Sequence, residues 1–291
     1  MMAAMTSHRE RPPLDAPLVR SLLQEPAGPL ARVEVVAATG STNADVAAAL
    51  RADPDAWPDR SVLVADHQVA GRGRAGRSWE TPAGTALTCT FVLYAPPAGP
   101  SLGWLPLVAG LGAVHALRAT AGVAAALKWP NDLLVPADDE VPGWGAFRKV
   151  GGILTELVPR AGGPAAVVVG VGVNVLQEAD ELPVPWATSL ALAGARHVDR
   201  LGMLTALVDA LDAVGRRWRE AGGDAVASGL AGEVAEVCAT LGTRVAVDEP
   251  GGAVVEGVAS RLDDDGALVV TGDDGAERRV LAGDVRHLRA V

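Results

Sequence analysis

The amino-acid sequence predicts an α+β fold in which a mixed sheet with helices is followed by a small SH3-like β-barrel. Up to about residue 240, apolar strand segments alternate with helical ones, whereas after Gly242 only short strands separated by Gly and Asp clusters remain. The chain of 291 residues is 49% hydrophobic, which is enough for a large core. Because aromatic residues make up only 3% of the chain, Val, Leu and Ala are expected to fill that core.

The first half of the chain is expected to hold a leader and the start of the sheet. Residues 1–30 have the polar, Pro-containing texture of a loosely ordered leader with one short helix, Asp15–Leu23. The turn Thr39–Asn43 opens the next helix, and Ser41 or Thr42 is suited to cap it. The segments expected here are strands Val33–Val36, Ser61–Ala65 and Thr85–Tyr94 and helices Ala44–Arg51 and Trp104–Ala121, the last with small residues for close packing.

The second half adds further strands, a long helix and the small β domain. Residues Ala137–Ala146 form a turn-rich insertion that is expected to be mobile. The turn Arg160–Gly163 joins two strands that contain glycine. We therefore expect a leader (1–30), a main domain (31–238) and a C-terminal SH3-like domain (239–291). The predicted elements are strands Ala124–Trp129, Leu133–Val135, Val150–Val158 and Ala165–Val175, helix Leu201–Glu220, and short strands Arg244–Val247, Ala253–Arg261, Leu268–Thr271, Arg278–Leu281 and Val285–Leu288.

Composition and charge exclude several classes of protein. The net charge of −10 argues against wrapping nucleic acid or lying on an anionic membrane, and there is no run of about 18 apolar residues that could span a bilayer. The polar start of the chain has no signal-peptide stretch. The two cysteines, Cys89 and Cys238, lack metal-ligand spacing, and the five histidines form no recognisable cluster. These features favour a cytoplasmic protein with neither DNA nor a membrane as partner.

A glycine- and arginine-rich loop spans Gly71–Arg77, with the sequence GRGRAGR. Its glycines allow the backbone to approach an anion closely, and its arginines offer planar donor groups suited to phosphate or carboxylate. It lacks the Gly-Lys-Ser/Thr end of a Walker loop and the strand–turn–helix context of a dinucleotide fingerprint. A solvated basic loop and an RGG-like nucleic-acid segment are alternatives, and the acidity of the chain counts against the latter.

Lysine is rare in this chain, and both lysines lie in distinctive surroundings. Only two of the 25 basic residues are lysines, Lys128 and Lys149. Codon bias is one explanation; a need for a compact ammonium group that guanidinium cannot replace is the other. Lys128 opens the sequence KWPND, whose Asn131 and Asp132 suit a triphosphate and its Mg²⁺. An ordinary Pro-Asn-Asp turn is the alternative, but the rarity of lysine favours a functional site.

Two predicted strands carry glycines where strands normally carry side chains. Lys149 is followed closely by Gly151 and Gly152, and Gly170 and Gly172 alternate so that both face the same side of their strand. A face cleared in this way indicates a slot for a flat apolar ligand. A tightly packed sheet crossing would explain these glycines equally well.

Five motifs in order along the chain resemble those of the biotin protein ligase family. They are Gly40–Asn43 (GSTN), Gln68 followed by Gly71–Arg77, Lys128–Asp132 (KWPND), Lys149–Leu154 (KVGGIL) and Gly170–Asn174 (GVGVN). Each motif alone is weak or moderate, whereas five in order are highly specific. The resemblance covers Val33 to about Glu220 and extends to the C-terminal barrel. It implies a catalytic domain, here 31–238, that is shared with lipoate ligases and related to class II tRNA synthetases, followed by the SH3-like domain.

The resemblance implies an enzyme that activates biotin with ATP and Mg²⁺ to biotinyl-5′-AMP and pyrophosphate. Biotin would then pass to a lysine of the biotin carboxyl carrier domain of an acyl-CoA carboxylase. Arg72, Arg74 and Lys149 are the expected catalytic residues, because they would neutralise the two anions that meet when the carboxylate attacks the α-phosphate. Asp132 is the expected metal ligand. We expect the loop Gly71–Trp79 to be mobile without ligand and to close on biotin, which would shield the adenylate from water.

The resemblance also implies two groups of binding residues. Those expected to bind biotin are Ser41, Thr42, Asn43, Gln68, Gly71, Arg72, Arg74, Lys149, Gly152, Gly170 and Gly172. Those expected to bind ATP are Arg74, Arg77, Trp79, Lys128, Asn131, Asp132, Asn174 and Ser189.

The sequence also departs from many family members at its start. About 30 residues precede Val33, too few for the helix-turn-helix domain that makes relatives repressors, so no DNA partner is expected. The subunit state stays open between a monomer and a homodimer. Three alternatives to the main interpretation are a lipoate or octanoate ligase of the same fold, a non-enzymatic biotin-sensing or nucleic-acid-binding protein, and a scaffold whose C-terminal barrel binds peptides.

Overall fold

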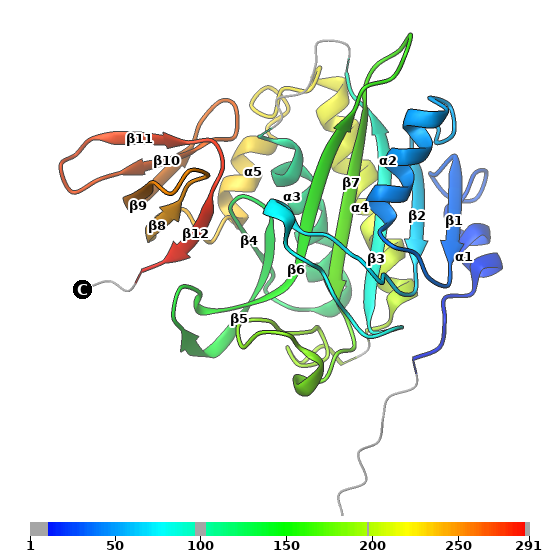
Figure 1. Cartoon of the computed structure of the whole chain (residues 1–291), viewed down its shortest axis with the longest axis horizontal. Coiled ribbons are helices and arrows are strands. Elements are labelled where there is room, and N and C mark those ends of the chain that lie inside the picture. The colour runs from blue at the N-terminus through cyan, green and yellow to red at the C-terminus, as the bar shows by residue number, and fades with distance from the viewer. Residues whose placement is uncertain (1–10, 97–102, 197, 289–291) are drawn as a thin grey trace, which may run out of the picture.

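The computed structural model describes residues 11–96, 103–196 and 198–288, so the first ten residues of the predicted leader lie outside it. Within these ranges, a seven-stranded sheet is followed by a five-stranded antiparallel sheet (Figure 1). The strand order of the first sheet is β1-β2-β3-β7-β6-β5-β4, in which β1 and β2 run parallel and the other neighbours antiparallel. The sheet is therefore mixed, as the sequence predicts. None of the described helices is long and apolar enough to cross a bilayer.

The larger domain follows the predicted order of elements, with one helix added. Its strands are β1 Arg32–Val36, β2 Ser61–Ala65, β3 Ala86–Tyr94, β4 Ala126–Lys128, β5 Asp132–Val141, β6 Gly145–Val158 and β7 Ala166–Asn174. Its helices are α1 Ala16–Leu23, α2 Thr42–Ala52, α3 Leu105–Ala121, α4 Arg200–Glu220 and α5 Leu230–Val237, with short 3₁₀ turns η1 Arg74–Gly76 and η2 Ala179–Glu181. Helix α5 escapes prediction because eight residues give too short a periodic pattern and Gly229 at its start offers no capping side chain.

Helices cover both faces of the seven-stranded sheet (Figure 1). On one face α3 packs against α4 over the main core, and a Cβ on Gly112 would come within 2.9 Å of Leu211. The small residues of α3 therefore allow the close packing that the sequence predicts. On the other face α2 lies over β3 and β7, with Val46 and Leu50 in a second, smaller core. Beside the start of α2, parts of β6 and β7 line a cavity, which is described in the next section.

The insertion at residues 137–146 is a hairpin with an irregular register, where the sequence predicted a mobile loop. Strands β5 and β6 continue through it, and Val141 pairs with Gly145 across the tip. Pro142 and Gly143 concentrate the turn residues in that tip, and Asp139 on the first strand pairs with Arg148 on the second at 2.6 Å. At the tip, the backbone N–H of His287 donates to the Gly143 carbonyl at 3.0 Å. The hairpin therefore reaches the C-terminal domain.

Residues 11–30 are also better ordered than a loose leader. The predicted helix is present as α1, with Asp15 as its N-cap and Val19 and Leu23 buried in the main core. Ahead of it, Arg11 forms hydrogen bonds to Glu181. The segment is therefore packed onto the larger domain.

The C-terminal strands form a sheet in the order β11-β10-β9-β8-β12. They are β8 Arg244–Asp248, β9 Val254–Leu262, β10 Leu268–Thr271, β11 Glu277–Val280 and β12 Asp284–His287. Over the described residues β11 and β12 are the two edges, so no hydrogen-bonded ladder closes this small domain into a complete barrel.

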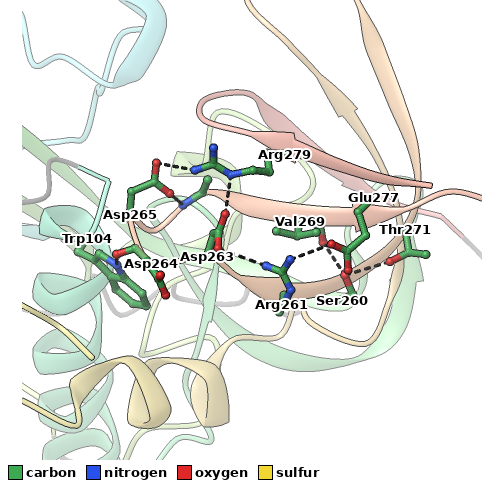
Figure 2. Close-up of polar contacts among 11 residues, drawn as sticks. Trp104, Ser260, Arg261, Asp263, Asp264, Asp265, Val269, Thr271, Glu277 and Arg279 are labelled. Carbon is green, nitrogen blue, oxygen red and sulfur yellow. Dashed lines mark hydrogen bonds and ion pairs between the residues drawn. The ribbon is translucent and has the colours of Figure 1, made fainter. Parts of the chain in front are cut away.

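The β9–β10 turn fixes the C-terminal domain to the larger one. Trp104 Nε1 donates to the Asp264 carbonyl at 2.8 Å, and Trp129 Nε1 donates to the Gly266 carbonyl at 3.1 Å. Figure 2 shows the Trp104 side chain reaching this turn from the start of α3. It also shows Arg279 bound to both Asp263 and Asp265. Two buried indoles and an ion-paired turn therefore hold the second sheet against the first.

Candidate functional site

A cavity of about 600 Å³ lies over β6 and β7, between the start of α2, the arginine loop, the end of β4 and the C-terminal domain. All the predicted site residues line this cavity except Gly71 and Ser189. The five sequence motifs therefore converge on one place in the fold. The two ends of the cavity differ in chemistry and are described in turn.

The neutral end of the cavity is built from Ser41, Thr42, Gln68 and Thr90. Ser41 caps α2, and the carbonyl oxygen of the Gln68 side chain accepts hydrogen bonds from the backbone N–H of Thr42 at 2.8 Å and from its hydroxyl at 3.0 Å. Thr90 Oγ1 lies 2.7 Å from Thr42 Oγ1 and 2.7 Å from Asn43 Oδ1. All these side chains are buried, so they hold one another in place without any charge.

Gly170 and Gly172 on β7 form the floor beside this neutral end. A Cβ on Gly170 would come within 2.3 Å of Asn43 Oδ1, and one on Gly172 within 2.8 Å of the Trp79 ring. Both glycines face the cavity, as their alternation predicts. At Gly152 the nearest atoms, on Lys149, would be 3.6 Å away, which is an ordinary contact. Close packing against Asn43 and Trp79 therefore explains why positions 170 and 172 are glycines. The cavity borders the same four residues.

Asn43, at the start of α2, links three elements at the neutral end. Its Nδ2 donates to the Leu154 carbonyl and to Glu156 Oε1, both at 3.1 Å, while its Oδ1 faces Thr90. The amide thus ties α2 to β6 and β3. Its predicted contact with biotin stays a prediction.

The arginine loop is folded over the cavity. The backbone N–H of Trp79 donates to the Gly71 carbonyl at 2.8 Å, and a Cβ on Gly71 would lie 2.4 Å from the Trp79 carbonyl oxygen. Gly71 is therefore needed to close the loop. Arg74 Nη1 lies 3.4 Å from both Asn131 Oδ1 and the Gly283 carbonyl, and Arg77 forms an ion pair with Asp284. The loop thus contacts both the KWPND turn and the C-terminal domain.

The charged end of the cavity contains both lysines of the chain. Lys149 Nζ lies 2.6 Å from Asp132 Oδ1, because β6 and β5 pair with Asp132 opposite Gly152. Lys128, at the end of β4, is only 3% exposed. Burial lowers its pKa to about 8, although Asp132 opposes the shift, and the nearby positive charge of Lys149 lowers the pKa further. The two ammonium groups and the one carboxylate form a compact, net positive cluster.

Two tryptophans at the charged end were not predicted. Trp144 at the hairpin tip stacks on Trp186, with ring centroids 6.0 Å apart and planes at 11°. The ammonium of Lys128 lies 3.6 Å from the centroid of the Trp144 ring. Trp186 is held beside the lysines because the backbone N–H of Lys149 donates to the backbone carbonyl of Trp186 at 2.7 Å. The available signal was a tryptophan set among turn residues in a chain poor in aromatics.

The C-terminal domain also contributes side chains that were not predicted. Asp248, Asp284 and Arg286 line the cavity, and Arg286 binds Asp248 through two hydrogen bonds of 2.8 and 3.0 Å. Next to them, burial and the neighbouring Lys128 lower the pKa of His287 to about 4. These residues lie in no motif and are 99 or more positions from the lysines, so only the fold brings them together.

Asn174 and Ser189 have different positions relative to the cavity. Asn174 lines it, and its side chain donates to the Thr188 carbonyl at 2.9 Å and accepts from Gln177. Ser189 lies outside, because its hydroxyl donates to the Gln177 carbonyl at 2.7 Å in the turn after β7. The geometry thus gives Ser189 a role in holding this turn, and its contact with ATP stays a prediction.

Asp132 is the carboxylate best placed to hold a metal ion. Across the described residues no three His, Cys, Asp or Glu side chains group as a metal site. Mg²⁺ bound through one carboxylate and the phosphates of a nucleotide needs no such group. Asp132 lies in the cavity among Lys128, Lys149 and Asn131, so the donor set fits this mode of binding.

Comparisons with known proteins agree with this geometry. The model of the biotin/lipoate A/B protein ligase family matches residues 37–174, and that of the biotin protein ligase C-terminal domain matches residues 240–288. The chain is 38% identical to a biotin--[acetyl-CoA-carboxylase] ligase of Mycobacterium tuberculosis, over 97% of this chain and 98% of that protein. It is 33% identical to the ligase of the same name from Paracoccus denitrificans, over 84% of this chain and 95% of that protein.

A solved structure has a similar fold over most of this chain. The biotin protein ligase of Aquifex aeolicus in complex with biotin and ATP superposes with a TM-score of 0.70 at 25% identity, covering 90% of this chain and all of that one. Sequence, both domains and the site thus lead to one assignment. The chain belongs to the biotin protein ligase family.

Proposed function

We propose that this protein is a biotin protein ligase, which forms biotinyl-5′-AMP from biotin and ATP and passes the biotin to a lysine of a biotin carboxyl carrier domain. The observation that carries the proposal is one cavity with a neutral hydrogen-bonding end and a cationic end. A ring with polar groups fits the first, and a carboxylate meeting a triphosphate fits the second. Residues 31–238 would be the catalytic domain and 239–291 the SH3-like domain.

The first step joins two anions, and the cavity supplies positive charge where they meet. A biotin carboxylate oxygen attacks the α-phosphorus, the bond from that phosphorus to the bridging oxygen breaks, and pyrophosphate leaves. Arg72, Arg74 and Lys149 would stabilise the charge that develops. Mg²⁺ held by Asp132 would take up charge on the pyrophosphate. No side-chain nucleophile is required, because the substrate carboxylate supplies it.

In the second step the amine of the carrier lysine attacks the acyl carbon, AMP leaves, and the amine loses a proton. The adenylate must be protected from water until then. Closure of Gly71–Trp79 over the cavity would provide that protection, and the anchoring of Trp79 on Gly172 marks where the loop would rest. A cytoplasmic location, where ATP and the carboxylase are available, is part of this proposal.

The neutral end favours biotin over the acids of related ligases. Gln68 and Thr42 offer fixed polar groups that a ureido ring can use. Lipoate and octanoate carry apolar tails, which cannot form hydrogen bonds with these polar groups. A lipoate or octanoate ligase is therefore the weaker alternative.

Release of pyrophosphate from ATP and Mg²⁺ tests the proposal, with biotin, lipoate and octanoate in parallel. We expect pyrophosphate release with biotin but not with lipoate or octanoate. We also expect transfer of labelled biotin to a purified carrier domain. Release with lipoate only would keep the adenylation chemistry and overturn the substrate. No release with any acid would overturn the enzyme assignment.

A further inference from the structure

Residues Arg11–Asp15, here called the strap, lie directly before α1 and contact segments that lead into the cavity. The strap makes three polar links to other parts of the fold. Arg11 binds Glu181, the Pro12 carbonyl accepts from Arg200, and the Leu14 N–H donates to Asp66. None of these links belongs to a sequence motif.

The first link reaches the segment 175–188 that follows β7. Arg11 Nη1 and Nη2 each lie 2.6 Å from a carboxylate oxygen of Glu181, so the pair is bidentate. Their side chains are 17% and 22% exposed, which limits screening by water. Glu181 closes η2, and the chain then supplies Val184 and Trp186 to the charged end of the cavity. A planar, two-point contact thus fixes the start of the segment that carries Trp186.

The same contact places one positive charge beside an acidic cluster and offsets part of its negative charge. Glu178, Asp180 and Glu181 all raise the pKa of Arg11, with the hydrogen bond to Glu181 as the largest cause. In the sequence, these three carboxylates come just before Pro183, the first residue of the segment that lines the cavity. Because ATP is a polyanion, carboxylates left uncompensated there would repel it.

The other links reach the neutral end. Asp66 lies two residues before Gln68, accepts from the Leu14 N–H at 3.1 Å, and pairs with buried Arg200 at 2.6 Å. A Cβ on Gly84, just before β3, would lie 3.1 Å from the Arg11 carbonyl oxygen, so the strap is in close contact there as well. One short stretch of backbone therefore braces the segments that lead into both ends of the cavity.

We infer that Arg11 is a positioning residue for ATP: it holds the Glu178–Trp186 segment in register with the lysines and offsets part of the negative charge of its carboxylates. This inference rests on the proposed function. Arg11 touches no substrate and acts through Glu181. Loss of Arg11 should therefore weaken ATP while leaving biotin, whose contacts lie at the neutral end, almost unchanged.

Steady-state kinetics of the full chain test the inference. We expect Arg11→Ala to raise the KM for ATP roughly five- to tenfold, with the KM for biotin within about twofold of wild type, since a charge-assisted bidentate pair is lost. The exchange Arg11→Glu with Glu181→Arg should restore most of the ATP affinity. The effect should shrink as salt rises, because part of it is charge repulsion. Arg244→Ala, which removes an equally bidentate pair with Asp273 away from the cavity, is the matched control.

Two results would overturn the inference. One is an Arg11→Ala protein with the wild-type KM for ATP. The other is an equal loss for ATP and biotin, independent of salt and accompanied by a lower Tm, which would mean general destabilisation. If the wild-type chain releases no pyrophosphate, the proposed function has failed and ATP binding is followed instead by tryptophan fluorescence. Weaker ATP binding by Arg11→Ala would then still support the strap, and equal binding would overturn it.

Discussion

The two ends of the cavity are stabilised in opposite ways. At the neutral end, Thr42, Gln68 and Thr90 are held by short hydrogen bonds among uncharged groups. At the charged end, Lys149 is paired with Asp132. We expect Thr42 and Gln68 to keep their mutual hydrogen bonds when a ligand binds. Lys149, in contrast, must leave Asp132 in order to contact the ligand.

This difference separates binding from chemistry. A preorganised neutral site selects its ligand by shape and hydrogen-bonding pattern, and a substitution there should change affinity. A cluster of charges aimed at a reacting group lowers the barrier instead, so a substitution there should change the rate. Each prediction below tests this division, from the largest expected effect to the smallest.

Removal of the Lys149 ammonium should have the largest effect. Lys149→Ala removes the cation beside the expected reacting carboxylate and leaves Asp132 without its ion-pair partner. We expect kcat for pyrophosphate release to fall about 10²- to 10³-fold, the range found when one transition-state donor is lost. The KM for biotin should change far less. Lys149→Arg should stay impaired, because a planar guanidinium is a poor substitute for a compact ammonium.

A methyl group added at Gly170 should damage the neutral end. The new Cβ would lie 2.3 Å from Asn43 Oδ1 and would displace Asn43, at the start of α2, together with its hydrogen bonds. We expect Gly170→Ala to raise the Kd for biotin roughly tenfold or more, consistent with about 1–3 kcal/mol of overpacking. Isothermal titration with biotin measures this directly.

Gly152→Ala is the matched control for that experiment. Its Cβ would meet nothing closer than 3.6 Å, and it lies on the neighbouring strand of the same cavity. We expect at most a small change in biotin affinity. Equal losses for the two variants would mean that steric contact with Asn43 is not what makes Gly170 necessary.

The sequence predicted the neutral end better than the charged end, for a physical reason. Gln68 was implied only by the family resemblance, but Ser41 and Thr42 follow from the turn that opens a helix, and Gly170 and Gly172 follow from alternation along one strand. Both rules are local, so one chain segment is enough to apply them. The charged end depends on Trp144, Trp186 and Asp284, which come from a hairpin tip, a loop and the second domain.

Errors in the predicted fold have the same origin. The strand segments 33–36, 61–65 and 85–94 were predicted within a residue or two because their apolar runs are local signals. The hairpin at 137–146 looked like a mobile loop because its strands are polar and project beyond the core, and the order of residues 11–30 depends on partners far along the chain, such as Glu181. Only tertiary contacts specify such segments.

The lowered pKa of Lys128 should make ATP binding depend on pH. Its pKa lies near 8, lowered by burial, so the ammonium form predominates below pH 8 and is lost as the pH rises. At pH 9 only about one Lys128 in ten would be charged. We therefore expect the KM for ATP to rise about tenfold from pH 7 to pH 9, while the KM for biotin stays nearly flat.

Lys128→Arg shows whether this residue causes the pH dependence. Arginine stays protonated throughout the range, so the variant should bind ATP more weakly overall but with a much flatter profile. An unchanged profile would assign the dependence to another group. A parallel rise in the KM for biotin would contradict the division between the two ends.

The contact between Arg77 and Asp284 should have the smallest effect. Both side chains are about half exposed, so the pair contributes little to stability, on the order of 1 kcal/mol or less. Asp284→Asn keeps the size of the side chain and releases Arg77 toward the cavity. If Arg77 then serves ATP, its KM should fall about two- to threefold. The matched control is Asp273→Asn, which breaks the exposed pair with Arg244 outside the cavity and should leave the KM unchanged. A rise in the KM for ATP on Asp284→Asn would mean instead that the C-terminal domain holds the arginine loop in its working position.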